Sequence, residues 1–368
     1  MSKALRMVCV LAVTLLTGAG SGQAEDEKDI ARMNAGAITL ITDGSNGQSA
    51  HYAADLAVLM EAERDLRILP VIGHGPVEAV RDLLFLRGID ASIVPSDTIA
   101  YMRKQGLIED IDKKVTYVAR LGSAQIHVIA RKEIASLQDL AGKNINIGTA
   151  SEARFVTGSL LFDTLGISFN AIDGAEAEAA GLLKSGKADA IILLAPQPSP
   201  VAEDLARTGG FKLLDVTGND ELNEIYAPAM LNAKTYEGLA QDDGMTETLS
   251  VSYVVAVFNW KKGTDRYYKL RKFADVLYSG IGDLQTGRWH AAWNDVNLSA
   301  DLPGWTRYVT ADEWLANHKR TGADKETKEE AALRDEFQAY LERTNTGIGV
   351  GDGPSLEGFV KMKSSALQ

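Results

Sequence analysis

Apolar and polar positions alternate along the chain in a pattern that predicts strands and helices in turn. A short apolar run over 37–41 is followed by a polar turn, and Tyr52, Leu56 and Leu59 then recur at helical spacing. Apolar runs over 66–72 and 91–94 flank a second amphipathic segment, which Gly75-Pro76 opens. Strands that alternate with helices of this length predict a parallel sheet covered on both faces.

The same alternation begins again after residue 143. A strand is expected over 144–147, helices over about 152–165 and 175–185, and a strand over 188–194. Between the two units, 115–130 predicts two strands around Gly122. The β-branched, aromatic run over 249–258 could carry the chain back to the first unit.

This pattern predicts an α/β protein with two lobes, each a mostly parallel sheet with helices on both faces. The chain is also long for a single core. We expect lobe 1 to comprise 36–132 plus 252–320, lobe 2 to comprise 133–251, and hinges to lie near Arg131 and Val251. Residues 321–368 predict a charged helix and a glycine-rich flexible tail.

The first 24 residues have the features of a secretory signal peptide. Lys3 and Arg6 precede the apolar run 7–16, and small residues lead to a cleavage position after Ala24. The run is too short for a permanent membrane span; an uncleaved N-terminal anchor is the alternative. Cleavage predicts a periplasmic protein and removes Cys9, the one cysteine of the chain, so disulfides and thiolate chemistry are not expected.

Charge narrows the range of partners. The formal net charge is −12 over the whole chain and becomes more negative once the two basic residues of the leader are removed. An acidic surface argues against nucleic acid or anionic lipid as a partner. It does not exclude an anionic ligand, because a buried site sets its own local field.

Four loops at predicted strand ends are the candidate ligand sites, since ligands of open parallel sheets bind beyond the carboxyl ends of the strands. The loop 42–49 is glycine-containing, and Ser45, Gln48 and Ser49 offer neutral hydrogen bonds. It lacks the Gly-Lys-Ser/Thr of a phosphate-binding loop. A plain connecting turn with a Ser49 cap is the alternative interpretation.

The loops 73–76 and 95–97 occupy equivalent positions. His74 could touch a ligand, although a lone exposed histidine is more often incidental. Ser96 is expected to cap the following helix and to face the cleft. Asp97 is interpreted as a first-turn acid that favours the helix dipole rather than as a catalyst.

The fourth loop, 148–154, combines helix amides with a cation. If Ser151 is the N-cap, Arg154 falls at the third helical position, and Thr149 lies just before it. Backbone N–H groups with a guanidinium suit a carboxylate or phosphate. The alternative is that Arg154 pairs with Glu152 or with solvent.

Nothing in the sequence requires an enzyme. The five histidines are scattered without metal-ligand spacing, and no nucleophile-elbow or calcium-loop pattern is present. No cofactor and no metal are therefore expected.

The order of these loops resembles the TAXI solute receptors of tripartite ATP-independent periplasmic (TRAP) transporters, within the type II periplasmic binding protein fold. The similarity runs from about Ile38 to Tyr308, and its most specific block is Ala91-Ser92-Ile93-Val94-Pro95-Ser96-Asp97-Thr98-Ile99-Ala100-Tyr101. Further blocks are 50–52, 73–80, 137–143, 148–154 and 187–200. The resemblance implies ligand binding between the lobes, small carboxylates such as amino acids or dicarboxylates as ligands, and an integral membrane permease as partner.

Carried over by position, the resemblance implies that contacts come from both lobes, namely Ser45, Gln48, Ser49, Tyr52, Ser96, Arg154 and Gln197; Thr149 and Ser151 complete the predicted site. The chain departs from the family pattern at Ala53-Ala54, where a proline usually follows the tyrosine. It also departs at the helix entry of the second lobe, usually serine-glycine-threonine, because 149–152 has no glycine and Glu152 adds an acid. Glu152 could repel an anion or hold an amine. A binding protein of an ABC transporter and a periplasmic sensor or enzyme module on the same fold are the alternative functions.

Overall fold

A computed structural model describes residues 36–45, 47–61, 66–232, 234–239 and 245–318. The predicted signal peptide 1–24 and the predicted tail 321–368 lie outside the described residues. Residues up to 311 form one compact unit and those from 312 a second. In the described part of the chain, no helix combines the length and the apolar character that crossing a membrane requires.

The first half of the main unit alternates strand and helix as predicted. Its elements are β1 (Ala37–Thr42), α3 (Gln48–Glu61), β2 (Arg67–Ile72), α4 (Pro76–Phe85), β3 (Ala91–Pro95), α5 (Asp97–Lys104), α6 (Ile111–Lys114) and β4 (Val115–Arg131).

The remaining elements repeat the alternation and then return. They are the 3-10 turn η1 (Gln138–Leu140), β5 (Asn144–Asn146), α7 (Ala153–Thr164), β6 (Asn170–Ala171), α8 (Glu176–Lys184), β7 (Ala190–Ala195), α9 (Pro200–Thr208), β8 (Phe211–Leu214), α10 (Asp220–Asn223), β9 (Ala227–Asn232), β10 (Met245–Phe258), α11 (Asp265–Leu284) and the 3-10 turn η2 (Ala291–Asp295).

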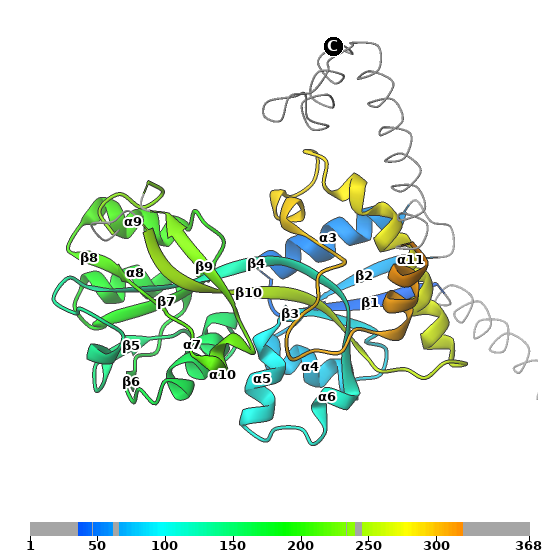
Figure 1. Cartoon of the computed structure of the whole chain (residues 1–368), viewed down its shortest axis with the longest axis horizontal. Helices are drawn as coiled ribbons and strands as arrows, with labels where there is room; N and C mark the ends of the chain where they lie inside the picture. Colours follow the sequence, from blue (N-terminus) through cyan, green and yellow to red (C-terminus); the bar gives the residue numbers. More distant parts are fainter. Residues whose placement is uncertain (1–35, 46, 62–65, 233, 240–244, 319–368) are drawn as a thin grey trace, which may run out of the picture. The chain divides into compact units, whose positions relative to one another are not determined.

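The strands join in the order β2-β1-β3-β10-β4-β7-β5-β6, with β8 on β4 and β9 on β10. The pairs β1–β2, β1–β3, β5–β6 and β5–β7 are parallel, whereas the pairs made by β10 and β4 are antiparallel. Helices lie on both faces of the first half, with α3 and α11 on one side and α4 and α5 on the other (Figure 1). The predicted two-lobed α/β fold is confirmed; its sheet is mixed, because β4 and β10 add antiparallel pairs to the parallel ones of each half.

Two long strands, β4 and β10, run through both halves (Figure 1). The start of β4 pairs with the end of β10, and its residues from Gln125 onward pair with β7. The prediction of two strands around Gly122 is therefore wrong, because the strand continues through the glycine. Its register with β10 shifts between Ser252 and Val254 and again between Val255 and Ala256, and such irregularities bend a strand locally.

Near Gln125, β4 passes from pairing with β10 to pairing with β7, and the predicted hinges near Arg131 and Val251 remain predictions. Arg131 is the last residue of β4 and pairs with Phe211 inside the second half. The predicted boundaries of the two lobes remain a prediction.

Each half has its own apolar core. In the first, Val80, Leu83 and Ile99 from α4 and α5 pack on Val94 and Val254. The second has a separate cluster in which α8 and α9 pack on β7 and β8. Each fully buried aliphatic side chain contributes on the order of 2 kcal/mol to the free energy of unfolding. The two cores make each half rigid enough to hold loops at its edge.

Candidate functional site

An open cavity of about 970 Å³ lies between the two halves of the main unit. Its walls are the turns that follow β1 and β2, the loop that precedes α7, the starts of α8 and α9, and Tyr253 of β10. The parallel strands β1 and β2 end here, and so do β5 and β7 of the other half. The cavity therefore lies beyond the carboxyl ends of these strands, where ligands of open α/β sheets bind.

Five helices begin at this cavity. Gln48, Ala153, Glu176 and Pro200 are the first residues of α3, α7, α8 and α9, and Gly75 is the N-cap of α4; all five line the cavity. The unpaired N–H groups and the positive dipole ends of helices attract anions. The convergence favours a ligand with at least one anionic group.

Asp43 lies in the wall that the first half contributes, and its side chain is nearly buried, with 8% of the residue exposed. Ser49 Oγ donates a short hydrogen bond to its Oδ1, and Gly75 N donates to its backbone oxygen at 2.8 Å. Burial raises the pKa of Asp43 to about 6, against the smaller lowering effect of the Ser49 hydrogen bond. With a pKa about one unit below neutral pH, the carboxyl group is mostly charged at pH 7.

Gln48 adds an acceptor beside Asp43. The residue is 7% exposed, lines the cavity, and its Oε1 has no hydrogen-bond partner among the described residues. A buried amide oxygen without a partner is costly, on the order of 1–3 kcal/mol. A ligand N–H would satisfy it.

Arg154 is the most deeply buried charge at the site, with 1% of its side chain exposed. Its Nη1 donates to Asn146 Oδ1 at 2.7 Å and to the Ile192 oxygen at 3.1 Å, while Nη2 donates to the Gly174 oxygen at 2.9 Å and to Glu152 Oε2 at 3.3 Å. Burial lowers the pKa of its guanidinium, and Glu152 and Glu176 oppose that shift. The terminal nitrogens are thus fully used within the protein.

Glu176 is the second acid of the cavity that the sequence did not single out. Burial raises the pKa of its carboxyl group, Arg154 lowers it and Glu152 raises it further. With Asp43 and Glu152, it gives the cavity three carboxyl groups against one cation that is already engaged.

Four of the predicted ligand contacts line this cavity: Ser45, Gln48, Ser151 and Arg154. Their role as ligand contacts remains a prediction. Ser45 and Ser151 are exposed, so their hydroxyls are accessible from the opening.

Two predicted contacts of α3 point into the protein instead. Ser49 is buried and bonded to Asp43. Tyr52 is fully buried; its hydroxyl donates to the Ala292 oxygen at 3.2 Å and accepts from Gly122 N at 3.0 Å. The structure places both behind the cavity wall, because they lie on the core face of the helix.

Thr149 and Gln197 also lie outside the lining of this cavity. Thr149 N donates to Glu152 Oε2 at 2.8 Å, and its hydroxyl is 3.0 Å from Ser151 Oγ. Gln197 Nε2 donates to Thr235 Oγ1 at 2.9 Å, while its Oε1 accepts from Asn232 N at 3.1 Å. Both side chains are engaged in holding loops of the second half.

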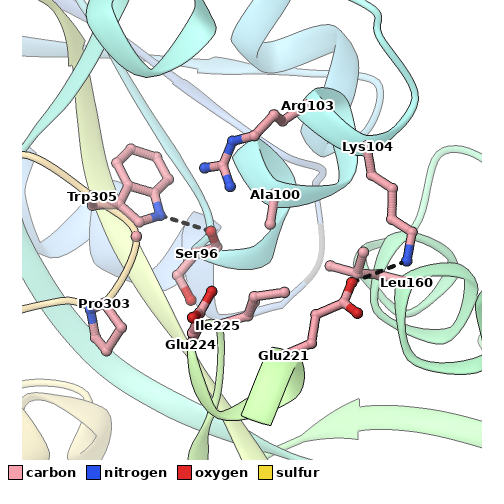
Figure 2. Close-up of a pocket in the computed structure, with 11 residues that line it drawn as sticks. Ser96, Ala100, Arg103, Lys104, Leu160, Glu221, Glu224, Ile225, Pro303 and Trp305 are labelled. Carbon is pink, nitrogen blue, oxygen red and sulfur yellow. Dashed lines mark hydrogen bonds and ion pairs between the residues drawn. The ribbon is translucent and has the colours of Figure 1, made fainter. Parts of the chain in front are cut away.

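Ser96 lines a second cavity of about 500 Å³, drawn in Figure 2. Trp305 Nε1 donates to the backbone oxygen of Ser96 at 2.8 Å, and Lys104 forms an ion pair with Glu221 of α10 at 3.3 Å. In Figure 2 these side chains surround the opening between α5 and α10. Ser96 lines this second cavity and not the larger one.

Ser96 is the N-cap residue of α5, as predicted, but it adopts helical backbone angles and its side chain makes no capping bond. The predicted cap of α7 is wrong, because its N-cap is Glu152 rather than Ser151. Arg154 is thus the second helical residue, one position earlier than expected. The reason is that Ser151 Oγ bonds to Thr149 Oγ1, and the turn closes one residue later.

The cavity lining also includes Tyr253, His51 and His290, which were not predicted from the sequence. His51 and His290 stack with ring centroids 4.4 Å apart, and burial lowers the pKa of His290. They come from segments about 240 residues apart, so no local motif links them. His74 also lines the cavity. Within the described residues, no group of three His, Cys, Asp or Glu side chains could hold a metal ion.

A comparison with protein families matches residues 51–274 to the model of the NMT1-like family, which is more than half of the chain. The chain belongs to the NMT1-like family. The matched segment includes most of both halves and the loops that carry Arg154 and Gly75. No curated protein sequence matches the chain significantly.

Solved structures similar to this NMT1-like chain include a TctC solute binding protein from Polaromonas, 15% identical, with a TM-score of 0.46 over 73% of this chain and 91% of that one. The holo form of ArgBP from T. maritima is 16% identical, with a TM-score of 0.40 over 70% and 94%. An amino acid ABC transporter substrate-binding protein, AbpA from Streptococcus pneumoniae bound to L-arginine, is 15% identical, with a TM-score of 0.42 over 72% and 98%.

Proposed function

We propose that this NMT1-like protein is an extracytoplasmic solute-binding receptor rather than an enzyme, and that it captures a small carboxylate in the cavity between its halves. The observation that carries the proposal is the convergence of five helix starts on one cavity beside the nearly buried Asp43. Helix N-termini suit the carboxylate of the ligand, and Asp43 with Gln48 Oε1 suits an amino group. An amino acid presents both.

The proposed mechanism is capture by closure. Ligand contacts on both halves would stabilise a closed arrangement. The strands β4 and β10 pass through both halves and would bend where they leave one half and enter the other. Closure removes water, which strengthens each hydrogen bond and lets few polar contacts suffice. Ser45, Gln48, Ser151 and Arg154 are the proposed lining contacts; Ser49, Tyr52, Thr149 and Gln197 would support them.

We further propose export through the leader 1–24 and a TRAP permease of the membrane as the partner, on the resemblance to TAXI receptors. We also propose Ser96, which lines the second cavity, as a ligand contact in an arrangement of the two halves that is closed to a different degree. A fused membrane permease gene beside this one would support the TRAP partner, whereas an ATPase gene would favour an ABC transporter.

A thermal-shift screen tests the capture function. Amino acids, dicarboxylates and tricarboxylates are added to ligand-free protein, and binding to the folded state raises the melting temperature by mass action. The proposal predicts that at least one small carboxylate shifts the melting temperature in a saturable way. A flat response over the whole panel, or turnover of an added compound, would contradict it.

A further inference from the structure

Glu152 carries a feature that the proposed function does not require. Its carboxylate accepts backbone hydrogen bonds from two separate segments, from Thr149 N to Oε2 and from Glu176 N to Oε1, both at 2.8 Å. Arg154 Nη2 and Thr149 Oγ1 each approach Oε2 at 3.3 Å. One side chain thus collects four donors.

This donor set is that of a carboxylate-binding site. One N–H group in the turn before α7, one at the start of α8, and a guanidinium match the two oxygens of a carboxylate in geometry and charge. Arg154 is fixed by Asn146, Gly174 and Ile192, and its buried Nε has no partner among the described residues. The guanidinium is therefore held in place by three partners besides Glu152.

The loop is shaped around the Glu152 carboxylate. Gly148 has φ +96, and a Cβ there would lie 2.8 Å from both Glu152 Oε2 and Arg154 Nε. Only glycine fits both the backbone angle and the space. Glu152 itself lines the cavity and is 24% exposed at its side chain, so the carboxylate forms part of the wall that a ligand meets.

We propose that Glu152 is an internal carboxylate that occupies the anion site of the second half and so determines which ligands are accepted. A second carboxylate on the ligand would meet the filled site and the acids Asp43 and Glu176. An amino group would find acceptors there. This inference rests on the proposed function and narrows it: the cavity takes monocarboxylates with an amino group and rejects dicarboxylates.

Acetate tests this role without any knowledge of the natural ligand. In Glu152→Ala the four donors lose their acceptor, and added acetate should take its place, raising the melting temperature by about 3 °C at saturating concentration. The wild-type protein, compared with sodium chloride at equal ionic strength, should move by less than about 1 °C.

Glu178→Ala is the matched control. Glu178 Oε2 also accepts a backbone N–H at the start of α8, from Ala175 at 3.0 Å, but Glu178 is exposed and does not line the cavity. No acetate rescue is expected for it. Equal acetate responses in Glu152→Ala, Glu178→Ala and wild type would overturn the proposal.

Glu152→Gln gives a second test that keeps the side-chain volume. We expect succinate to bind at least about tenfold more tightly to this variant than to wild type, because a negative charge has been removed from the wall. Unchanged succinate affinity would count against the proposal even if Glu152→Ala fails to fold. The two proposals can fail separately. If acetate stabilises Glu152→Ala but no compound of the panel stabilises the wild type, the anion site is supported and the proposed function is contradicted.

Discussion

At the scale of single residues, Asp43 couples the cavity to pH. Burial raises its pKa to about 6, so the carboxyl group gains its proton just below neutral pH in the free protein. A cationic ligand group beside it would lower that pKa, so binding would release a proton below pH 6. Ligand affinity and the charge of Asp43 are then linked.

We predict that ligand affinity falls as the pH is lowered from 7 to 5, by roughly tenfold if the ligand contacts Asp43 directly. Asp43→Asn should bind more weakly at pH 7 and lose this dependence. Dissociation constants measured from pH 5 to 8 for an amino acid found in the screen check both statements. Parallel pH profiles for the wild type and the variant would refute the assigned role of Asp43.

The sequence located the loops but not all of the side chains within them. Ser45 and Gln48 line the cavity because a strand-to-helix turn must face that edge of the sheet. Tyr52 illustrates the opposite outcome, since the helical spacing that places it with Leu56 on the core face also turns it away from a ligand. Asp43 and Glu176 went unrecognised because burial, which shifts their pKa values, is a property of the folded chain.

At the scale of elements, the loop that opens α4 meets the loop that opens α7. Gly75 has φ +110, and a Cβ on it would lie 2.8 Å from Ser151 Cα. Gly75 belongs to a loop of the first half and Ser151 to a loop of the second, and both residues line the cavity. The glycine lets these loops approach each other.

Gly75→Ala should therefore weaken ligand binding by at least about tenfold, because the added methyl group keeps the two loops apart. Gly88→Ala is the matched control: Gly88 has φ +99, and its added Cβ would have no heavy atom within 4 Å. Both variants should lose roughly 1 kcal/mol of unfolding free energy through backbone strain. Calorimetric affinities and denaturant melts separate the two effects, and equal affinities in the two variants would contradict the role of Gly75.

Element prediction was accurate where a strand or helix has a single environment. The predicted helices at 152–165 and 175–185 are α7 and α8 within one or two residues. The prediction of two strands over 115–130 was wrong because it relied on the tendency of glycine to interrupt a strand, and Gly122 does not interrupt β4. Glycine is required at position 122 because Tyr52 Oη and the Ala292 oxygen lie close to the backbone of β4. A Cβ on this residue would lie within 3 Å of both atoms.

At the scale of the main unit, a buried polar cluster connects the two halves. Asp97 Oδ2 of α5 accepts from Thr157 Oγ1 of α7 at 2.6 Å and from Tyr226 Oη at 3.1 Å. The sequence predicted Asp97 only as an acid in the first turn of a helix. Its partners Thr157 and Tyr226 lie 60 and 129 residues further along the chain, so no local spacing rule links them to Asp97.

The central claim is that the cavity between the halves captures one small amino acid. Isothermal titration of ligand-free protein tests it most directly when combined with a blocked cavity. Ala177 lines the cavity on α8 and is exposed, so Ala177→Trp fills it; Val58→Trp alters an exposed α3 position outside the lining. The account predicts saturable one-to-one binding in wild type and Val58→Trp, and its loss in Ala177→Trp. Equal binding in all three proteins would contradict it.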